Sequence, residues 1–229
     1  MIKPIKYYGT FTDDFGTTAI CILNDFSNLY FEIDGVKFEG LEFGDFEITN
    51  KESYSGKQLE RFTFCSTVIC NHKMTVFIPQ VIIDTVEKKT FTTDLTLEYD
   101  LGKPKLPNLN RFDYKLRITT KIDEQTFEGV SDCYFEDAFD QILKQIGDRY
   151  KFRNCYGCLY SDYSPYGQRG FGGMYCFVRQ KEKYLKVDIP KDSYKYDYLE
   201  ALAYDYDVVQ ETYFCDKYEI RKKGTGYRG

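Results

Sequence analysis

The chain has 229 residues, of which 42% are hydrophobic and 29% are charged, and this composition excludes an intrinsically disordered protein. Its formal net charge of −5 argues against nucleic acid as the main partner, because an acidic surface repels phosphate backbones. No apolar run approaches the ~20 residues that span a bilayer, so no membrane association is expected.

Twenty-two tyrosines and 19 phenylalanines favour β-structure, and residues 1 to about 125 predict a run of strands. The Asp34-Gly35 pair lies between two short alternating segments and predicts a tight hairpin. Closely spaced strands without helical patterns between them indicate antiparallel sheets in a sandwich or open barrel. The strands are predicted at 17–23, 29–33, 36–39, 41–48, 59–70, 73–84, 90–99 and 112–121. Two prolines within 102–110 predict a long loop.

One helix is predicted near 134–146. Its inward face consists of apolar residues at helical spacing: Phe135, Ala138, Phe139, Ile142, Leu143 and Ile146. Ser131 or Asp132 can cap its start, and Gly147 can end it. A shorter helix is predicted at about 196–204. The fold class is therefore α+β, mostly antiparallel β-sheet, with a β-rich region at 1–130 and a cysteine-containing region at 131–229. One continuous domain is the alternative.

Four cysteines in the last third of the chain predict a structural zinc site. Cys155 and Cys158 form a C-x-x-C pair, and Cys176 and Cys215 lie in two predicted strands. One turn and two strands can together present four thiolates in a tetrahedron, at zinc–sulfur distances of about 2.3 Å. This would make the last third a cysteine-clamped module. The alternative is four small buried hydrophobic side chains, with disulfides as a third reading.

The remaining cysteines and the single histidine are given no function. Cys21, Cys65 and Cys70 lie in predicted strands and Cys133 precedes the helix, so burial is expected for all four. His72 is expected in an exposed turn, where it would take no part in catalysis or metal binding.

The C-terminal third also carries a motif. It reads C-x-x-C-x-x-SDYSPYG from Cys155, followed by Cys176, by E-T-x-x-C ending at Cys215, and by GTGYRG at the end of the sequence. This pattern resembles an uncharacterised bacterial protein family. The resemblance implies a bacterial source and implies that these segments form one site.

No catalytic set is apparent, so the sequence favours a non-enzymatic protein that binds another protein. Tyrosines alternating with aspartates at 194–206 suit a binding surface, and the acidic charge suits a basic partner. An immunity-type protein that blocks a toxin is one such class. One alternative is an enzyme with a site near the glycine-rich loop that uses Asp162, Arg169 and Glu211. A structural or assembly subunit is another. The visible start has no signal-peptide pattern and the cysteines suit a reducing compartment, so a cytoplasmic location is expected.

Overall fold

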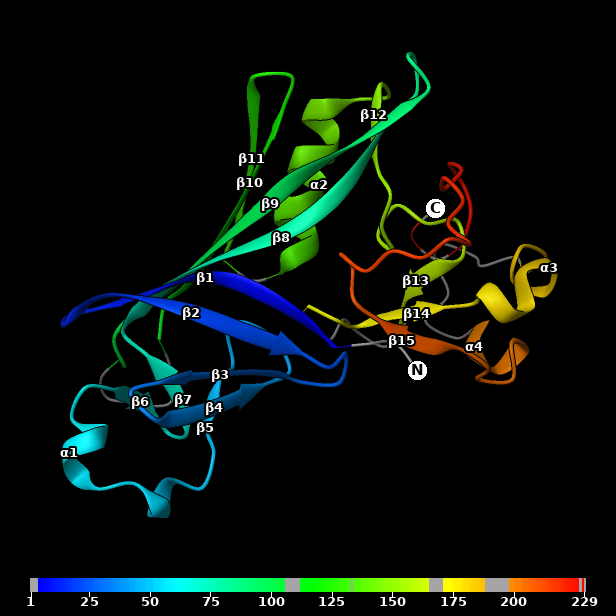
Figure 1. Ribbon diagram of the computed structural model, residues 1–229. Coiled ribbons are helices and arrows are strands. Elements are labelled where there is room, and N and C mark those ends of the chain that lie inside the picture. The colour runs from blue at the N-terminus through cyan, green and yellow to red at the C-terminus, as the bar shows by residue number, and fades with distance from the viewer. Residues whose placement is uncertain are drawn as a thin grey trace. The chain divides into compact units, whose positions relative to one another are not determined.

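The computed structural model describes residues 4–105, 112–132, 134–164, 171–187, 198–226 and 228 (Figure 1). Its contacts divide the chain into two compact units. Unit 1 comprises Met1–Pro79 and Thr93–Gly147, and unit 2 comprises Gln80–Thr92 and Asp148–Gly229. Each unit is described by itself below. The sequence boundary near residue 130 stays a prediction, but contacts place the helix that follows it in unit 1.

The protein as a whole is 46% strand and 14% helix, mostly antiparallel sheet, which confirms the predicted α+β class. Unit 1 carries most of this sheet. The strand order is β11-β10-β9-β8-β1-β2-β3-β4-β5-β7-β6. Strands β8 and β9 continue into unit 2. The strands are β1 (Ile5–Asp13), β2 (Gly16–Asn24), β3 (Leu29–Ile33), β4 (Val36–Gly40), β5 (Glu47–Ile48), β6 (Thr63–Cys65), β7 (Val68–Cys70), β8 (His72–Asp84), β9 (Lys89–Leu101), β10 (Tyr114–Ile122) and β11 (Gln125–Ser131).

The predicted hairpin at Asp34-Gly35 is present and joins β3 to β4. Both turn residues have positive φ, 51° and 79°, as a type I′ turn requires. The segment predicted as one strand at 59–70 instead holds the end of α1 (Gly56–Leu59) and the short β6–β7 hairpin, after the single-turn η1 (Lys51–Ser53). The segment at 41–48 is mostly irregular and forms a strand only at β5. Most of the loop predicted at 102–110 lies outside the described residues.

Aromatic side chains from β1, β3 and β4 and from the segment before β5 form part of the unit 1 core. Phe31 of β3 stacks on Phe38 of β4 with ring centroids 4.9 Å apart, and meets Phe46 edge-on at 4.6 Å. Phe11 of β1 approaches Phe31 across the core at 6.2 Å. The β3–β4 hairpin therefore packs its inner face against β1.

Helix α2 (Phe135–Ile146) confirms the predicted helix and ends at Gly147. It packs closely on β11, where a Cβ at Gly129 would lie 1.8 Å from the Ala138 carbonyl oxygen. Only a residue without a side chain allows this approach. The helix starts after Tyr134, whose N–H donates to the Ser131 hydroxyl.

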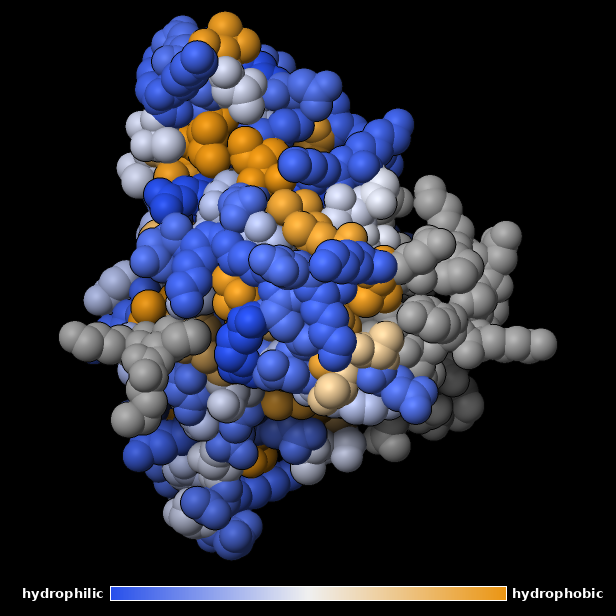
Figure 2. All heavy atoms as spheres, turned by 90° about the vertical axis from the view of Figure 1, so that its right-hand side faces the viewer, coloured by the Kyte–Doolittle hydropathy of each residue, from blue (hydrophilic) through white to orange (hydrophobic). Residues whose placement is uncertain are grey.

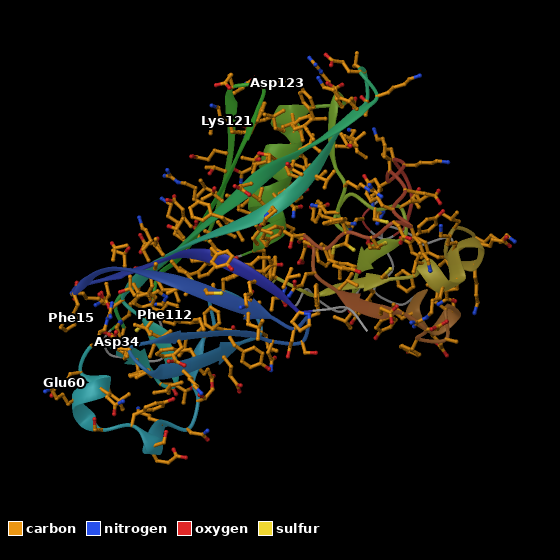
Figure 3. All side chains as sticks on the ribbon, viewed as in Figure 1. Phe15, Asp34, Glu60, Phe112, Lys121 and Asp123 are labelled. Atoms are coloured by element: carbon orange, nitrogen blue, oxygen red, sulfur yellow. The ribbon has the colours of Figure 1, made fainter. Side chains whose placement is uncertain are left out.

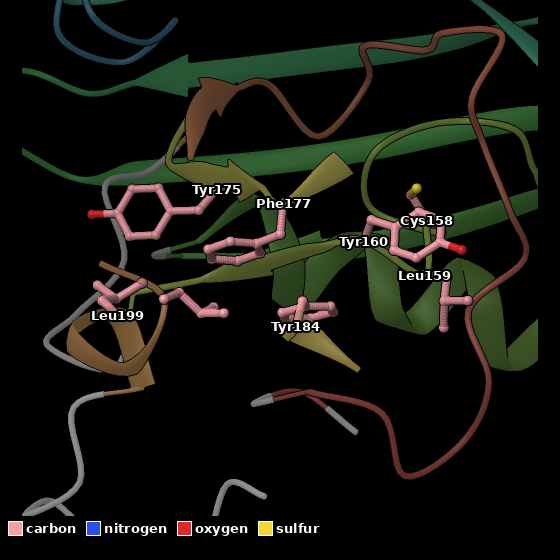
Figure 4. Packing of buried hydrophobic residues seen from close by; sticks show 8 residues of the cluster. Cys158, Leu159, Tyr160, Tyr175, Phe177, Tyr184 and Leu199 are labelled. Carbon is pink, nitrogen blue, oxygen red and sulfur yellow. The ribbon is translucent and has the colours of Figure 1, made fainter. Parts of the chain in front are cut away.

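Unit 2 contains two short groups of strands and its own aromatic core. Strand β12 (Tyr150–Phe152) pairs with the end of β8, and β13 (Ser161–Tyr163), β14 (Met174–Cys176) and β15 (Asp207–Val209) form a second sheet. Phe177 stacks on Tyr184 at 4.8 Å (Figure 4). The helical turns are η2 (Val178–Gln180), α3 (Lys181–Tyr184) and α4 (Tyr198–Ala201). Helix α4 is shorter than the helix predicted at 196–204, part of which lies outside the described residues.

Candidate functional site

The C-x-x-C segment of unit 2 folds as a tight turn. The Cys158 N–H donates to the Cys155 carbonyl at 3.1 Å, and the Gly157 N–H donates to the side-chain oxygen of Asn154 at 3.1 Å. The Asn154 amide in turn donates to the side-chain oxygen of Gln80 at 2.8 Å. Both cysteines of the turn are buried.

Backbone contacts bring the segments that carry the other two cysteines next to this turn. Cys176 ends β14 and pairs with Ser161 of β13. The Cys155 N–H donates to the carbonyl of Tyr213 at 2.7 Å, two residues before Cys215. Segments that are far apart in the sequence therefore meet in one part of unit 2.

The four thiols influence one another electrostatically. Burial raises the pKa of Cys155 well above its ordinary value, and Cys176, Cys158 and Cys215 each raise that pKa further. Burial also raises the pKa of Cys176, against the effect of the Val178 N–H, which donates to it and lowers the pKa. All four thiols are free, without a disulfide.

The four thiols do not form a metal site as they stand. Within the described residues, no group of three or more His, Cys, Asp or Glu side chains is placed to hold a metal ion. The four-cysteine zinc site and the cysteine-clamped module therefore stay predictions.

The two carboxylates of the enzyme alternative lie in one buried network, and neither side chain has any exposed surface. Asp162 accepts from the Tyr184 hydroxyl at 2.8 Å and from the Arg228 side chain at 3.3 Å, with Arg221 3.4 Å away. Asp162 thus holds the last described residue of the chain. Arg169, the third residue of that alternative, lies outside the described residues.

Glu211 lies in the same network and is linked to Arg228 through Tyr163, whose ring centre lies 5.2 Å from the Arg228 guanidinium. It accepts from the Tyr163 hydroxyl at 3.0 Å and from the Gly172 N–H at 2.7 Å. Burial raises the pKa of Glu211 to about 7, and these hydrogen bonds and Arg228 oppose that rise. The guanidinium of Arg228 lies 4.5 Å from the ring centre of Tyr156. Each carboxylate is thus enclosed by protein groups.

The outward face of unit 1 carries a row of exposed apolar side chains that the sequence analysis did not identify. Tyr8 of β1 lies directly opposite Cys21 of β2 and Phe77 of β8. Tyr8 is 63% exposed, Phe77 is 41% exposed, and Leu23, two residues after Cys21, is 38% exposed. We call Tyr8, Cys21, Leu23 and Phe77 the apolar row. Buried and exposed side chains alternate along β2, with Cys21 and Leu23 at exposed positions. This alternation in the sequence is the feature that could have predicted the β2 part of the apolar row.

The two expectations for cysteine burial and for His72 have mixed outcomes. Cys65 and Cys70 are buried as expected, but Cys21 is exposed, because it points to the outer face; Cys133 lies outside the described residues. The exposed-turn expectation for His72 is wrong, because His72 begins β8 with its side chain turned inward.

The sheet of unit 1 also opens next to the apolar row. The β2–β3 ladder contains only Asn24 opposite Leu29 and Leu23 opposite Tyr30, so residues 16–22 of β2 lie beyond it. A shallow pocket of about 320 Å³ lies at this opening, with Cys21 among its lining residues. We call this opening the β2–β3 split.

Arg61 closes the far end of the split. Its guanidinium donates to Asp13 at 2.7 Å and Thr18 at 2.8 Å on the β1–β2 hairpin, and to Asp34 at 2.5 Å on the β3–β4 hairpin. Figure 3 shows the tips of these hairpins, marked by Phe15 and Asp34, on the same side of unit 1. The split is therefore bounded at both ends.

Comparison with known proteins gives a family and no function. None of the helices in the described part has the length and apolarity that crossing a bilayer requires. Searches of curated proteins and of solved structures each find no match. Residues 5–161 match the Family of unknown function (DUF6304), a range that includes Cys155, Cys158 and Ser161 but not the rest of the predicted C-terminal motif. Because the match covers more than half of the sequence, the chain belongs to the DUF6304 family, which confirms the expectation of an uncharacterised family.

Proposed function

We propose that this protein is a non-enzymatic binding protein that recognises another protein through the outward face of β1, β2 and β8. The apolar row carries this proposal. Large apolar side chains scattered singly on a surface need no explanation, whereas aromatic side chains aligned across neighbouring strands favour an interface. Tyrosine suits such a surface because it adds contact area and a polar tip.

Hydrophobicity alone does not single out a surface on this molecule. On the face shown in Figure 2, hydrophobic residues lie in separate groups among hydrophilic ones. The apolar row differs because its members are in register on adjacent strands, with Lys6 opposite Leu23 at its edge. An apolar centre with a polar edge is the usual anatomy of a protein interface.

The net charge of −5 supports a basic partner, since opposite charge speeds encounter and suppresses wrong partners. A toxin blocked by an immunity-type protein is one such partner, and the proposed location is the bacterial cytoplasm. The buried Asp162 and Glu211 lend no support to the enzyme alternative, because neither side chain has any surface that a substrate could contact in this structure.

Paired capture experiments test the binding face. Tagged wild-type protein, a Tyr8→Ser/Phe77→Ser variant and a Phe15→Ser control are each incubated with extract of the native host. Phe15 is 70% exposed but sits at a hairpin tip, outside the apolar row. We expect one partner that wild type and Phe15→Ser capture equally and that the double variant loses at least tenfold. Equal capture by all three proteins contradicts the proposal.

The assembly-subunit alternative uses the same apolar row but a different partner, a second copy of the chain. Sedimentation velocity of purified wild type and of the Tyr8→Ser/Phe77→Ser variant separates the two functions. Concentration-dependent self-association that the double variant abolishes would favour the assembly subunit. A monomer in both samples favours a heterologous partner.

We also propose that Cys155, Cys158, Cys176 and Cys215 rotate their side chains to bind one structural zinc ion. Support comes from the donor set, since all four are thiols that act on one another, and thiolate sulfur is a preferred zinc ligand. Elemental analysis and thiol counting test it. One zinc per chain with four reactive thiols is expected. Eight reactive thiols and no metal would remove the site.

A further inference from the structure

We infer that the β2–β3 split binds a short extended segment of the protein partner, which adds to the unpaired edge of β2 as a strand. This inference rests on the proposed function and names the part of the partner that is recognised. Three observations carry it: the direction of the backbone groups at the split, the pocket inside it, and the contrast with the other edges of the sheet.

The register shows which backbone groups face the split. Ile33 and Val36 flank the two-residue turn of the β3–β4 hairpin, so they form a hydrogen-bonded pair. Hydrogen-bonded and non-hydrogen-bonded pairs alternate along an antiparallel ladder, so Tyr30 and Glu32 direct their N–H and C=O groups away from β4. Tyr30 uses these groups to pair with Leu23. By the same alternation along β2, Cys21 directs its groups toward the split.

Ala19, two residues before Cys21, directs its N–H and C=O toward the same side of β2. Within the described part of the chain, no strand pairs with either residue on that side. Both side chains are on exposed positions of β2, so water or a ligand can reach this edge. The natural complement of such an edge is another extended backbone, which supplies N–H and C=O groups at the matching spacing.

The pocket in the split gives the segment a place for one side chain. It is lined by residues of β2, β3 and β4 and by Thr49; Glu32 and Lys37 are its exposed charged residues, and Tyr30 and Cys21 lie beside the open edge of β2. Glu32 and Lys37 carry opposite charges and are paired across β3 and β4, so their charges offset each other. The preferred segment is therefore not strongly charged, and the side chain that enters the pocket lies beside Tyr30 and Cys21.

The split has a defined length. It runs from the Leu23–Tyr30 pair to the Arg61 bridge at Thr18, which leaves four residues of β2 between them. Four residues of a strand span about 13 Å. The bound part of the partner is thus a segment of about four residues, and the adjoining apolar row supplies the rest of the interface.

The other edges of the unit 1 sheet are protected. Strand β11 is bonded along its free side by the side-chain amides of Gln141 and Gln145. Strand β6, at the opposite end of the strand order, has three residues. Sheets generally block their edges in these ways because an open edge recruits other chains. Among the described strands of unit 1, β2 has nine residues and four of them lie along an open edge that lacks a covering helix.

A selected peptide serves as the probe. Random heptapeptides displayed on phage are selected against the full chain, and the consensus peptide is synthesised. Its Kd is measured for wild type, Ala19→Pro and Ala19→Ser. Proline removes the N–H that faces the split but no bond to β1, whereas serine keeps that N–H. We expect Ala19→Pro to weaken binding at least tenfold and Ala19→Ser to change it less than twofold.

Amide hydrogen exchange of wild type with and without the peptide supplies a readout that does not depend on the folding of a variant. We expect exchange at Ala19 and Cys21 to slow at least tenfold. Unchanged exchange at both amides, or equal Kd for Ala19→Pro and wild type, overturns the inference. If the native partner binds Ala19→Pro normally but is lost by Tyr8→Ser/Phe77→Ser, the proposed function survives and the strand-addition inference falls.

Discussion

The side-chain amide of Gln141 pairs with the backbone of Val130 as a neighbouring strand would. It donates to the Val130 carbonyl at 2.7 Å and accepts from the Val130 N–H at 3.2 Å. Gln145 repeats this at Glu128, donating at 2.5 Å and accepting at 3.4 Å. Four residues of helix rise about 6 Å, close to the rise of two strand residues, so two glutamines one turn apart fit alternate positions of the edge.

We predict that Gln141→Leu/Gln145→Leu destabilises the protein and promotes self-association. The double substitution leaves four backbone groups of β11 without protein partners, but they can be solvated, so we expect a loss of about 2–4 kcal/mol in the free energy of unfolding. Urea denaturation and sedimentation velocity measure the two effects. Lys144→Ala, on the exposed side of α2, is the matched control. An unchanged urea midpoint in the double variant would show that the amides are dispensable.

The substitution Gly129→Ala should destabilise the protein more than the same substitution at a glycine with free space around it. Its Cβ would lie 1.8 Å from the Ala138 carbonyl oxygen, so α2 must move away from β11. Overpacking of this kind costs about 1–3 kcal/mol. Gly56→Ala is the control, since a Cβ there meets nothing within 4 Å. Thermal unfolding of both variants checks the prediction, and equal midpoints would contradict it.

His72 should make the protein lose stability in mild acid. The imidazole is 5% exposed and stacks on Phe11 at 4.5 Å, and burial lowers its pKa to about 4, although Asp13 and Asp100 act to raise it. The unfolded chain, with a histidine pKa near 6.5, binds the proton first, so this stability is complete above pH 6.5 and falls as the pH drops toward 4. The total is about 3 kcal/mol.

The variant His72→Phe keeps the stacked ring and removes the titrating group. The free energy of unfolding, measured by urea from pH 7 to pH 4, should therefore fall about 3 kcal/mol less in this variant than in wild type. The carboxylates titrate in both proteins, so the difference between the two pH profiles of the unfolding free energy reports on His72. Parallel pH profiles would mean that the ring becomes protonated in the folded state without cost.

Arg228→Met should destabilise unit 2 strongly, although the residue is next to the C-terminal end of the sequence. It leaves the fully buried Asp162 with fewer partners, and removing one member of a buried ion pair costs about 3–5 kcal/mol. Lys223→Met, exposed in the same segment, is the control. Adding Asp162→Asn to Arg228→Met should restore part of the loss. A double variant less stable than Arg228→Met contradicts the pairing.

The sequence predicted the local structure of this protein better than its candidate sites. Helix α2 and the Asp34-Gly35 hairpin follow from residues that are close in sequence, namely an apolar stripe and a turn with two positive φ values. The apolar row depends on the registers of β1, β2 and β8, which join residues up to 69 positions apart. Those registers cannot be read from a single chain.

The buried network of unit 2 also depends on contacts between residues far apart in the sequence. Asp162 and Glu211 stand out in the sequence as candidate catalytic carboxylates, but both are fully buried, and Asp162 accepts a hydrogen bond from Arg228, which lies 66 positions further along the chain. His72 was misplaced for a related reason. A polar residue between short strands suggests a turn, whereas the strand register turns this ring into the aromatic core.

The labelling rate of the exposed Cys21 thiol tests the central claim most directly. Native host extract or buffer is added to the folded protein, a pulse of iodoacetamide follows, and peptide mass spectrometry quantifies alkylation at Cys21. A Phe15→Cys variant supplies a second exposed thiol away from the apolar row. The account predicts that extract slows labelling of Cys21 at least tenfold while residue 15 reacts at its buffer rate. Equal labelling of Cys21 in extract and in buffer would contradict it.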